Sequence, residues 1–96
     1  MKNAMTHDVW LREQLQDAVF AAEYLNAASE DEDPKTYLTA IRKVVDARCG
    51  MTALATQTEF SRETLYRTLS GRGNPTLKTL TAVLRATGLK IAVVPS

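Results

Sequence analysis

Residues 51–70 read MTALATQTEFSRETLYRTLS and carry the strongest structural signal in the chain. Their pattern predicts two short helices, Thr52–Thr58 and Arg62–Ser70, with a tight turn at Glu59 and Phe60 between them. Ser61 has the side chain of an N-cap, whose oxygen accepts from the first free amides of the second helix. Two short helices joined in this way form the helix-turn-helix arrangement.

The apolar residues of this stretch are spaced as such an arrangement requires. Ala55 provides a small side chain where the second helix crosses the first, and Phe60 provides an apolar plug beneath the turn. Leu65 and Leu69 lie one helical turn apart and share a face. We therefore expect these two leucines to anchor the second helix in the core and to leave its other face free.

The free face of the second helix carries side chains suited to reading DNA bases, namely Arg62, Glu63, Tyr66 and Arg67. Arginine can donate two hydrogen bonds to guanine, and glutamate can accept one from cytosine. Simpler roles exist for three of these residues. Glu63 and Arg67 are spaced to form a surface ion pair, and Tyr66 fits the core as well as the groove.

Residues around this helix are candidates for contacts with the DNA backbone. The free amides near Thr52 and Ser61, at the starts of the two short helices, can bind phosphate oxygens. Arg72 lies between two glycines and has little packing to do, and Lys78 follows on the next predicted helix. Asn74 is as consistent with a plain turn as with DNA contact.

The rest of the chain predicts further helices, giving an all-α bundle of five or six in total. Asp8 and Asp17 are expected to cap the first two helical stretches, the second running to about Ala28; whether these are one bent helix or two stays open. Asp33-Pro34 is a strong start signal for the next helix, and Gly50 is its stop. Thr76 is expected to cap a last helix, which Gly88 ends and whose apolar face comprises Leu77, Leu80, Val83 and Leu84.

The tail, residues 89–94, is rich in β-branched and aliphatic residues. Leu89, Ile91 and Val93 alternate onto one face, which predicts a strand. An isolated strand needs a partner for its backbone groups. Pairing with the same strand of a second copy would give a homodimer, and the alternative is a disordered tail.

Charge is divided unevenly along the chain, although the net charge is only +1. Residues 1–33 contain two basic and eight acidic residues, a net charge of −6, and residues 34–96 contain ten basic and three acidic residues, a net charge of +7. We expect an acidic helical segment, 1–33, and a helix-turn-helix unit with the terminal strand, 34–96, within one compact domain. Such a division fits a polyanion at one end and a different partner at the other, or two solvated faces that attract each other.

Several classes of function are excluded by what the sequence lacks. Cys49 and His7 are the only residues of their kinds, too few for a disulfide, a zinc site or a nucleophile–base pair. Cys49 is expected to be a half-buried filler rather than a reactive thiol. We expect neither an enzyme nor a cofactor, metal or small-molecule ligand.

The longest apolar run, Ala18–Ala22, cannot span a membrane, and no secretory signal is evident, so the cytoplasm is the expected location.

Residues Leu15–Val94 resemble the HigA-like addiction-module antidote proteins of the Xre helix-turn-helix superfamily. The similar stretches are 22–28 (AEYLNAA), 61–70 (SRETLYRTLS), 73–77 (GNPTL) and 88–91 (GLKI). The resemblance implies an antitoxin that neutralises a RelE/HigB-like ribonuclease toxin, represses its own operon and forms dimers. It also implies that base reading lies with Arg62, Glu63, Tyr66 and Arg67. One departure is Glu59, which stands where the turn usually carries glycine.

The resemblance gives the acidic segment a partner, since a basic ribonuclease would fit it by charge. Candidate residues for that contact are Trp10, Phe20, Glu23, Tyr24 and Glu30. Two alternatives stay open. The protein is either a stand-alone phage-repressor-like regulator without a toxin, or mainly a protein-binding antitoxin with weak DNA binding. In the main interpretation, a DNA-binding antitoxin, the dimer would bind a palindromic double-stranded operator.

Overall fold

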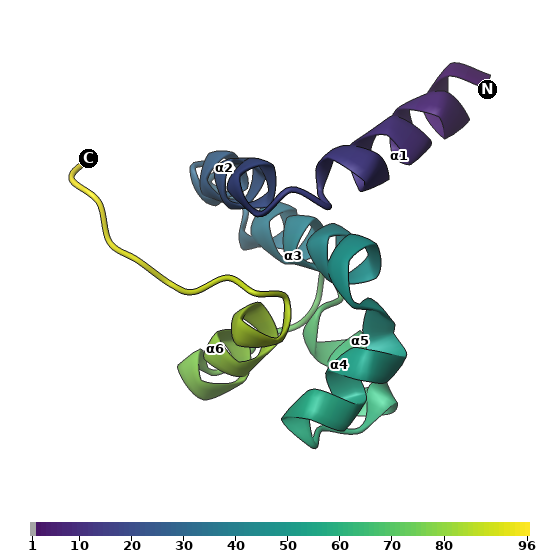
Figure 1. Ribbon diagram of the computed structural model, residues 1–96. Coiled ribbons are helices and arrows are strands. Elements are labelled where there is room, and N and C mark those ends of the chain that lie inside the picture. Colours follow the sequence, from purple (N-terminus) through teal and green to yellow (C-terminus); the bar gives the residue numbers. More distant parts are fainter. Residues whose placement is uncertain (1) are drawn as a thin grey trace.

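Helices make up all the regular structure of the computed structural model, which describes the backbone of residues 2–96 and the side chains of residues 7–96. Figure 1 shows the six helices, α1 (Lys2–Gln14), α2 (Ala18–Ser29), α3 (Pro34–Arg48), α4 (Gly50–Thr58), α5 (Arg62–Thr68) and α6 (Leu77–Ala86). The prediction of an all-helical bundle is confirmed for these residues. None of these helices is long and apolar enough to cross a membrane.

Most of the predicted helix starts are correct, because they depend on local capping chemistry. The side chains of Asp17, Asp33, Ser61 and Thr76 each accept a hydrogen bond from an amide of the first helical turn. Asp17 separates α1 from α2, which settles that they are two helices. Asp8 is a wrong prediction, because α1 already begins at Lys2 and Asp8 lies inside it.

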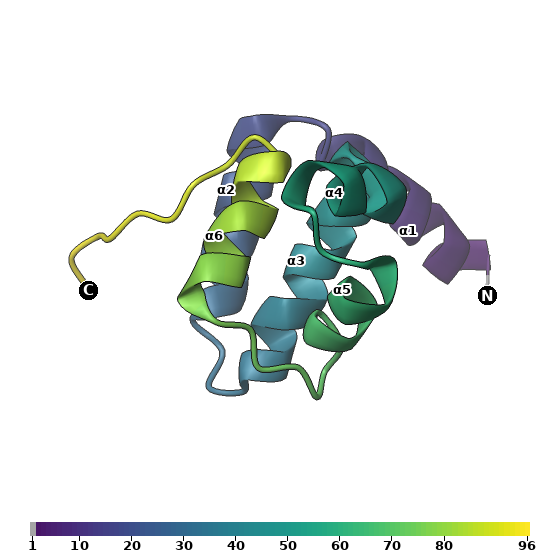
Figure 2. The same cartoon turned by 90° about the horizontal axis from the view of Figure 1, so that it is seen from below.

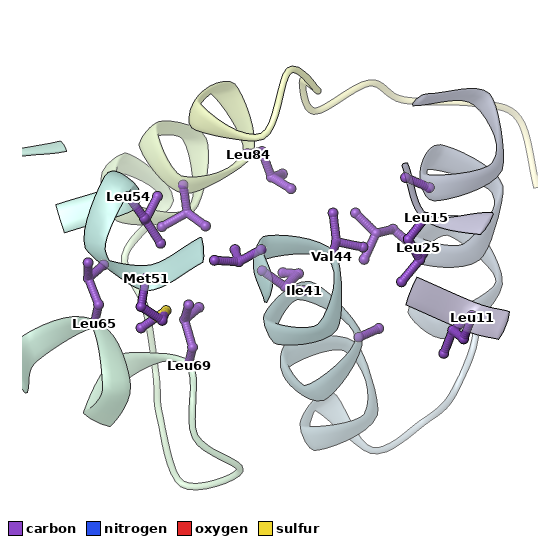
Figure 3. Close-up of a cluster of buried hydrophobic side chains, with 14 residues drawn as sticks. Leu11, Leu15, Leu25, Ile41, Val44, Met51, Leu54, Leu65, Leu69 and Leu84 are labelled. Carbon is purple, nitrogen blue, oxygen red and sulfur yellow. The ribbon is translucent and has the colours of Figure 1, made fainter. Parts of the chain in front are cut away.

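Helix α3 is the central element of the bundle (Figure 2). The hydrophobic core lies on both sides of it. Ile41 and Val44 of α3 are fully buried. In Figure 3 they stand between two groups of side chains, one from α1 and α2 and one from α4, α5 and α6. The first group is Leu11, Leu15 and Leu25, and the second is Met51, Leu54, Leu65, Leu69 and Leu84.

Arg48, the last residue of α3, fastens these two sides together. Its Nη1 donates to the carbonyl oxygens of Leu15 (3.2 Å) and Gln16 (2.6 Å), at the end of α1. Its Nε donates to the carbonyl oxygen of Thr87 (2.6 Å), at the end of α6. Carbonyls at helix ends lack partners within their own helix and carry partial negative charge. The guanidinium therefore has a structural role.

The last helix departs from the prediction at its first residue. Leu77 was expected on the apolar face of α6, but its side chain is 71% exposed. Val83 and Leu84 are buried as expected, and Leu80 packs partly buried against the core. Leu77 is the first residue of α6, directly after the cap Thr76. The N-terminal end of α6 extends beyond the edge of the core, so the Leu77 side chain stays exposed.

The predicted strand at the C-terminus is absent from the described chain. Residues 89–96 have no regular secondary structure and extend away from the body, on the side opposite α1 (Figure 1). Leu89 packs partly buried against the core, whereas Ile91 and Val93 are exposed, Val93 at 95%. The physical reason is that the helices around the tail have no free backbone groups in their middle turns with which a strand could pair.

Candidate nucleic-acid interface

The turn between α4 and α5 has an unusual backbone at Glu59. Its φ is 64° and its ψ is 9°, the left-handed helical region, and no other described residue except glycine has a positive φ. The Glu59 amide donates to the carbonyl oxygen of Ala55 at 3.0 Å and so closes α4. The turn keeps the left-handed conformation that glycine would adopt freely, with a glutamate in its place.

The inner face of α5 is buried as its sequence predicts. Leu65 and Leu69 have 0% and 2% of their surfaces exposed, and Leu54 of α4 is fully buried against them. Phe60 and Ala55 are half-buried and pack on the same core. These contacts fix the orientation of α5 and determine which of its side chains face outward.

The outer face of α5 presents four side chains to solvent, Arg62, Glu63, Tyr66 and Arg67. Glu63 and Arg67 do not form the ion pair that their spacing allows, since the one ion pair among the described side chains joins Arg42 and Asp46. Tyr66 is 38% exposed and outside the buried core. The structure thus brings all four predicted base-reading residues onto one accessible face.

Arg42 of α3 reaches this face, and sequence reasoning missed it. Its Cζ lies 4.5 Å from the centroid of the Tyr66 ring, and the Cζ of Arg62 lies 5.9 Å from the same centroid. Arg62 Nη2 also contacts the Tyr66 hydroxyl at 3.5 Å. Arg42 lies one helical turn after Leu38 and directly after Ile41, so helical spacing places it at the edge of the apolar face of α3. This spacing was the signal in the sequence that could have identified Arg42.

The starts of the two short helices differ from each other. Ser61 caps α5, its Oγ accepting from the Thr64 amide at 3.0 Å, as predicted. Thr52 does not cap α4, because that helix begins two residues earlier, at Gly50. Gly50 has a φ of 81°, which lets the chain leave α3 and enter α4 with only Cys49 between them. Thr52 is the third residue of α4, so its amide lies in the first turn of that helix. Its side chain is exposed.

The loop after α5 exposes the predicted backbone-contacting residues, Arg72 and Asn74, and Lys78 is exposed at the start of α6. Gly73 holds this loop against α5. Its amide donates to the carbonyl oxygen of Ser70 at 2.9 Å. A Cβ on Gly73 would overlap the Thr68 carbonyl group, so the close approach requires glycine.

The residues predicted to meet a protein partner lie across α3 from α4, α5 and α6, and they do not form one cluster. Trp10 is 47% exposed, and its ring meets that of Phe20 edge to face, with centroids 6.0 Å apart. Glu23 is exposed on α2, whereas Tyr24 is half-buried in a groove between α2 and α3. Glu30 lies at the far end of α2, as its C-cap.

Cys49 is half-buried at the junction of α3 and α4. Burial raises the pKa of the Cys49 thiol, the Asp46 carboxylate raises it further, and the positive charge of Arg48 lowers it in part. The thiol therefore stays protonated where a reactive cysteine would ionise. Within the described residues, no three His, Cys, Asp or Glu side chains come close enough to hold a metal ion.

A family model described as "Probable addiction module antidote protein" matches residues 6–95, almost the whole chain. The chain belongs to this family. A relative in Haemophilus influenzae, an uncharacterized protein, is 37% identical over 70 residues, which are 73% of this chain and 71% of the relative. No solved structure matches the chain.

Membership of an antidote family implies a toxin partner of some kind. The antidote part of the resemblance seen in the sequence is thereby confirmed. The narrower assignment to HigA-like proteins of the Xre superfamily, the binding of DNA and the type of toxin remain proposals.

Proposed function

We propose that this antidote is a DNA-binding antitoxin of the cytoplasm, a binding protein rather than an enzyme. In this proposal it represses its own operon and neutralises a RelE/HigB-like ribonuclease toxin. The observation that carries the DNA-binding part is the two-sided character of α5. Leu65 and Leu69 hold one face in the core, and the opposite face presents Arg62 and Arg67 to solvent.

The pair α4 and α5 acts as a helix-turn-helix, with α5 as the recognition helix in the major groove. Arg62 and Glu63 lie in its first turn, the part that reaches base edges in such proteins. Arg62 donates to guanine and Glu63 accepts from cytosine, while Arg67 contacts the groove one turn later. The exposed side chains of Arg72, Asn74 and Lys78 contact phosphates on either side.

The homodimer remains part of the proposal, with the tail as its contact. Ile91, Val93 and Val94 are exposed apolar residues in an extended segment. Ile91 and Val93 alternate onto one face and supply what a strand needs to pair with a second copy, whereas Leu89, the first residue of the predicted strand, packs against the core of its own chain. Two recognition helices about 34–36 Å apart would then read a palindromic operator.

A second function, direct binding of the toxin, is favoured by an aromatic pair on the acidic half, in which Trp10 is exposed and Phe20 is partly buried against the core. An exposed tryptophan is an unusual residue to leave in water and a frequent anchor in protein interfaces. The acidic residues Glu23 and Glu30 would attract a basic toxin from a distance. Because α1 and α2 lie across α3 from α5, DNA and toxin can bind at the same time.

The first experiment measures binding of the purified protein to the DNA upstream of its own gene and to scrambled DNA of the same length. A preference that persists at physiological salt supports operator recognition. Equal binding to both sequences that disappears at that salt would leave only a nonspecific electrostatic attraction. The protein-binding function would then take first place.

The second experiment tests the toxin. The gene neighbouring this one is co-expressed, and the complex is isolated through a tag on the antidote. Lysine in place of both Glu23 and Glu30 is expected to weaken capture, and unchanged capture would contradict a role for charge. If no gene beside this one encodes a small basic protein, the stand-alone regulator is favoured.

A further inference from the structure

Arg42 joins α3 to the outer face of α5 through a chain of charged and aromatic groups. Its Nε lies 3.4 Å from both carboxylate oxygens of Asp46, one turn along α3. The same guanidinium lies over the Tyr66 ring, with its Cζ 4.5 Å from the centroid. The Cζ of Arg62, on α5, lies 5.9 Å from the centroid of the same ring. Two guanidinium groups from different helices therefore share one tyrosine.

This arrangement leaves an excess of positive charge beside Tyr66. The ring attracts both cations through its negative faces. Asp46 can balance only one of them, and its contact is weak because the two side chains are 33% and 43% exposed. In the part of the chain that the structure describes, Arg42 donates hydrogen bonds only through Nε. Neither of its two Nη groups has an acceptor among the described side chains and backbone groups.

We propose that Arg42 binds a backbone phosphate of the DNA on which α5 docks, and that Asp46 competes with this phosphate for the guanidinium. The inference rests on the proposed DNA-binding function. Arginine binds phosphate with two parallel hydrogen bonds, which are stronger than one long contact to an exposed carboxylate. When DNA binds, the Arg42 guanidinium thus exchanges the Asp46 carboxylate for the phosphate. Its contact with the Tyr66 ring keeps the guanidinium on the DNA-facing side of the protein.

The consequence is that Asp46 lowers DNA affinity in the wild-type protein. A purely structural ion pair makes the opposite prediction, because its loss would loosen α3 and weaken binding. Asp46 also lines a groove with Asp8 and Leu11 of α1, on the acidic half of the protein. The competing carboxylate therefore stands at the border between the two halves of the molecule.

The test is a titration of fluorescent DNA from the upstream region with wild-type and variant proteins over a range of salt concentrations. Arg42→Gln keeps most of the side-chain length and removes the charge. Loss of one phosphate contact is expected to lower affinity about eightfold per bound chain at roughly 0.1 M salt, from counterion release alone. The slope of log affinity against log salt should fall by about one per chain.

Lys43→Ala is the matched control, since it removes the same charge from the next residue of α3. Lys43 lines the grooves against α1 and α2, away from Tyr66. It should leave the salt slope unchanged. Helix content and the melting temperature are recorded for each variant, so that an unfolded protein is recognised before its DNA binding is interpreted.

Asp46→Asn is the decisive variant, and it should raise DNA affinity in the wild-type background but not together with Arg42→Gln. An equal gain in both backgrounds would mean a general effect of charge and would overturn the competition. A salt slope unchanged by Arg42→Gln would overturn the phosphate contact. If the wild type prefers its upstream DNA and Arg62→Ala abolishes that preference, those failures concern only the inference. A wild type without any preference contradicts the proposed function as well.

Discussion

Glu59 offers a sharp test of the turn between α4 and α5, because replacing it with glycine should stabilise the protein. Its φ of 64° costs a non-glycine residue about 1–2 kcal/mol. Glycine removes that cost but adds freedom to the unfolded chain, which destabilises by about 0.4–1 kcal/mol. The free energy of unfolding should therefore rise by about 0.5–1 kcal/mol. For a domain of this size, the melting temperature then rises by about 2–8 °C.

The assay is thermal unfolding followed by circular dichroism, with two control variants. Thr58→Gly changes the preceding residue, which is helical and whose Oγ1 donates to the Leu54 carbonyl at 2.7 Å. It should lower stability by about 1 kcal/mol, because glycine is unfavourable inside a helix. Glu59→Ala keeps the strained backbone without the carboxylate and should melt near the wild type. A lower melting temperature for Glu59→Gly would refute the assigned strain.

Three further predictions concern other parts of the fold. Gly73→Ala should cost about 1–3 kcal/mol in urea unfolding, because its new Cβ meets the rigid Thr68 carbonyl group rather than a flexible side chain. Arg48→Met should cost about 2 kcal/mol, because the carbonyls that end α1 and α6 lose a charged donor; Arg48→Lys should recover part of the loss. Cys49 should react with iodoacetamide more slowly than free cysteine at pH 8, because its raised pKa keeps the thiol protonated, and unfolding in urea should remove the difference.

The parts of the fold that the sequence predicts well depend on neighbouring residues. Helix starts follow from the side chains of Asp17, Asp33, Ser61 and Thr76, each of which reaches an amide only two or three residues ahead. The inward face of α5 follows from helical spacing. Local chemistry of this kind is readable before any tertiary contact is known.

The parts that the sequence did not predict depend on residues that are distant in the chain. Arg48 contacts carbonyls 32 to 39 residues away, and nothing around it in the sequence announces them. The contact of Arg42 with Tyr66 likewise requires the packing of α3 beside α5. Leu77 matched the apolar period of α6 but lies beyond the edge of the core. The tail has the composition of a strand, yet a strand needs a partner that one chain does not supply.

The most direct test of the central claim measures how the substitution Arg67→Ala changes discrimination between the upstream DNA and its single-base variants at physiological salt. Arg67 is an exposed residue of α5, and Lys78, an exposed residue of α6, is the control. Arg67→Ala should cost about 1–3 kcal/mol of binding free energy and relax base preference at one position, whereas Lys78→Ala should weaken binding to all sequences alike. If Arg67→Ala bound the upstream DNA with unchanged affinity and preference, α5 would not be the recognition helix.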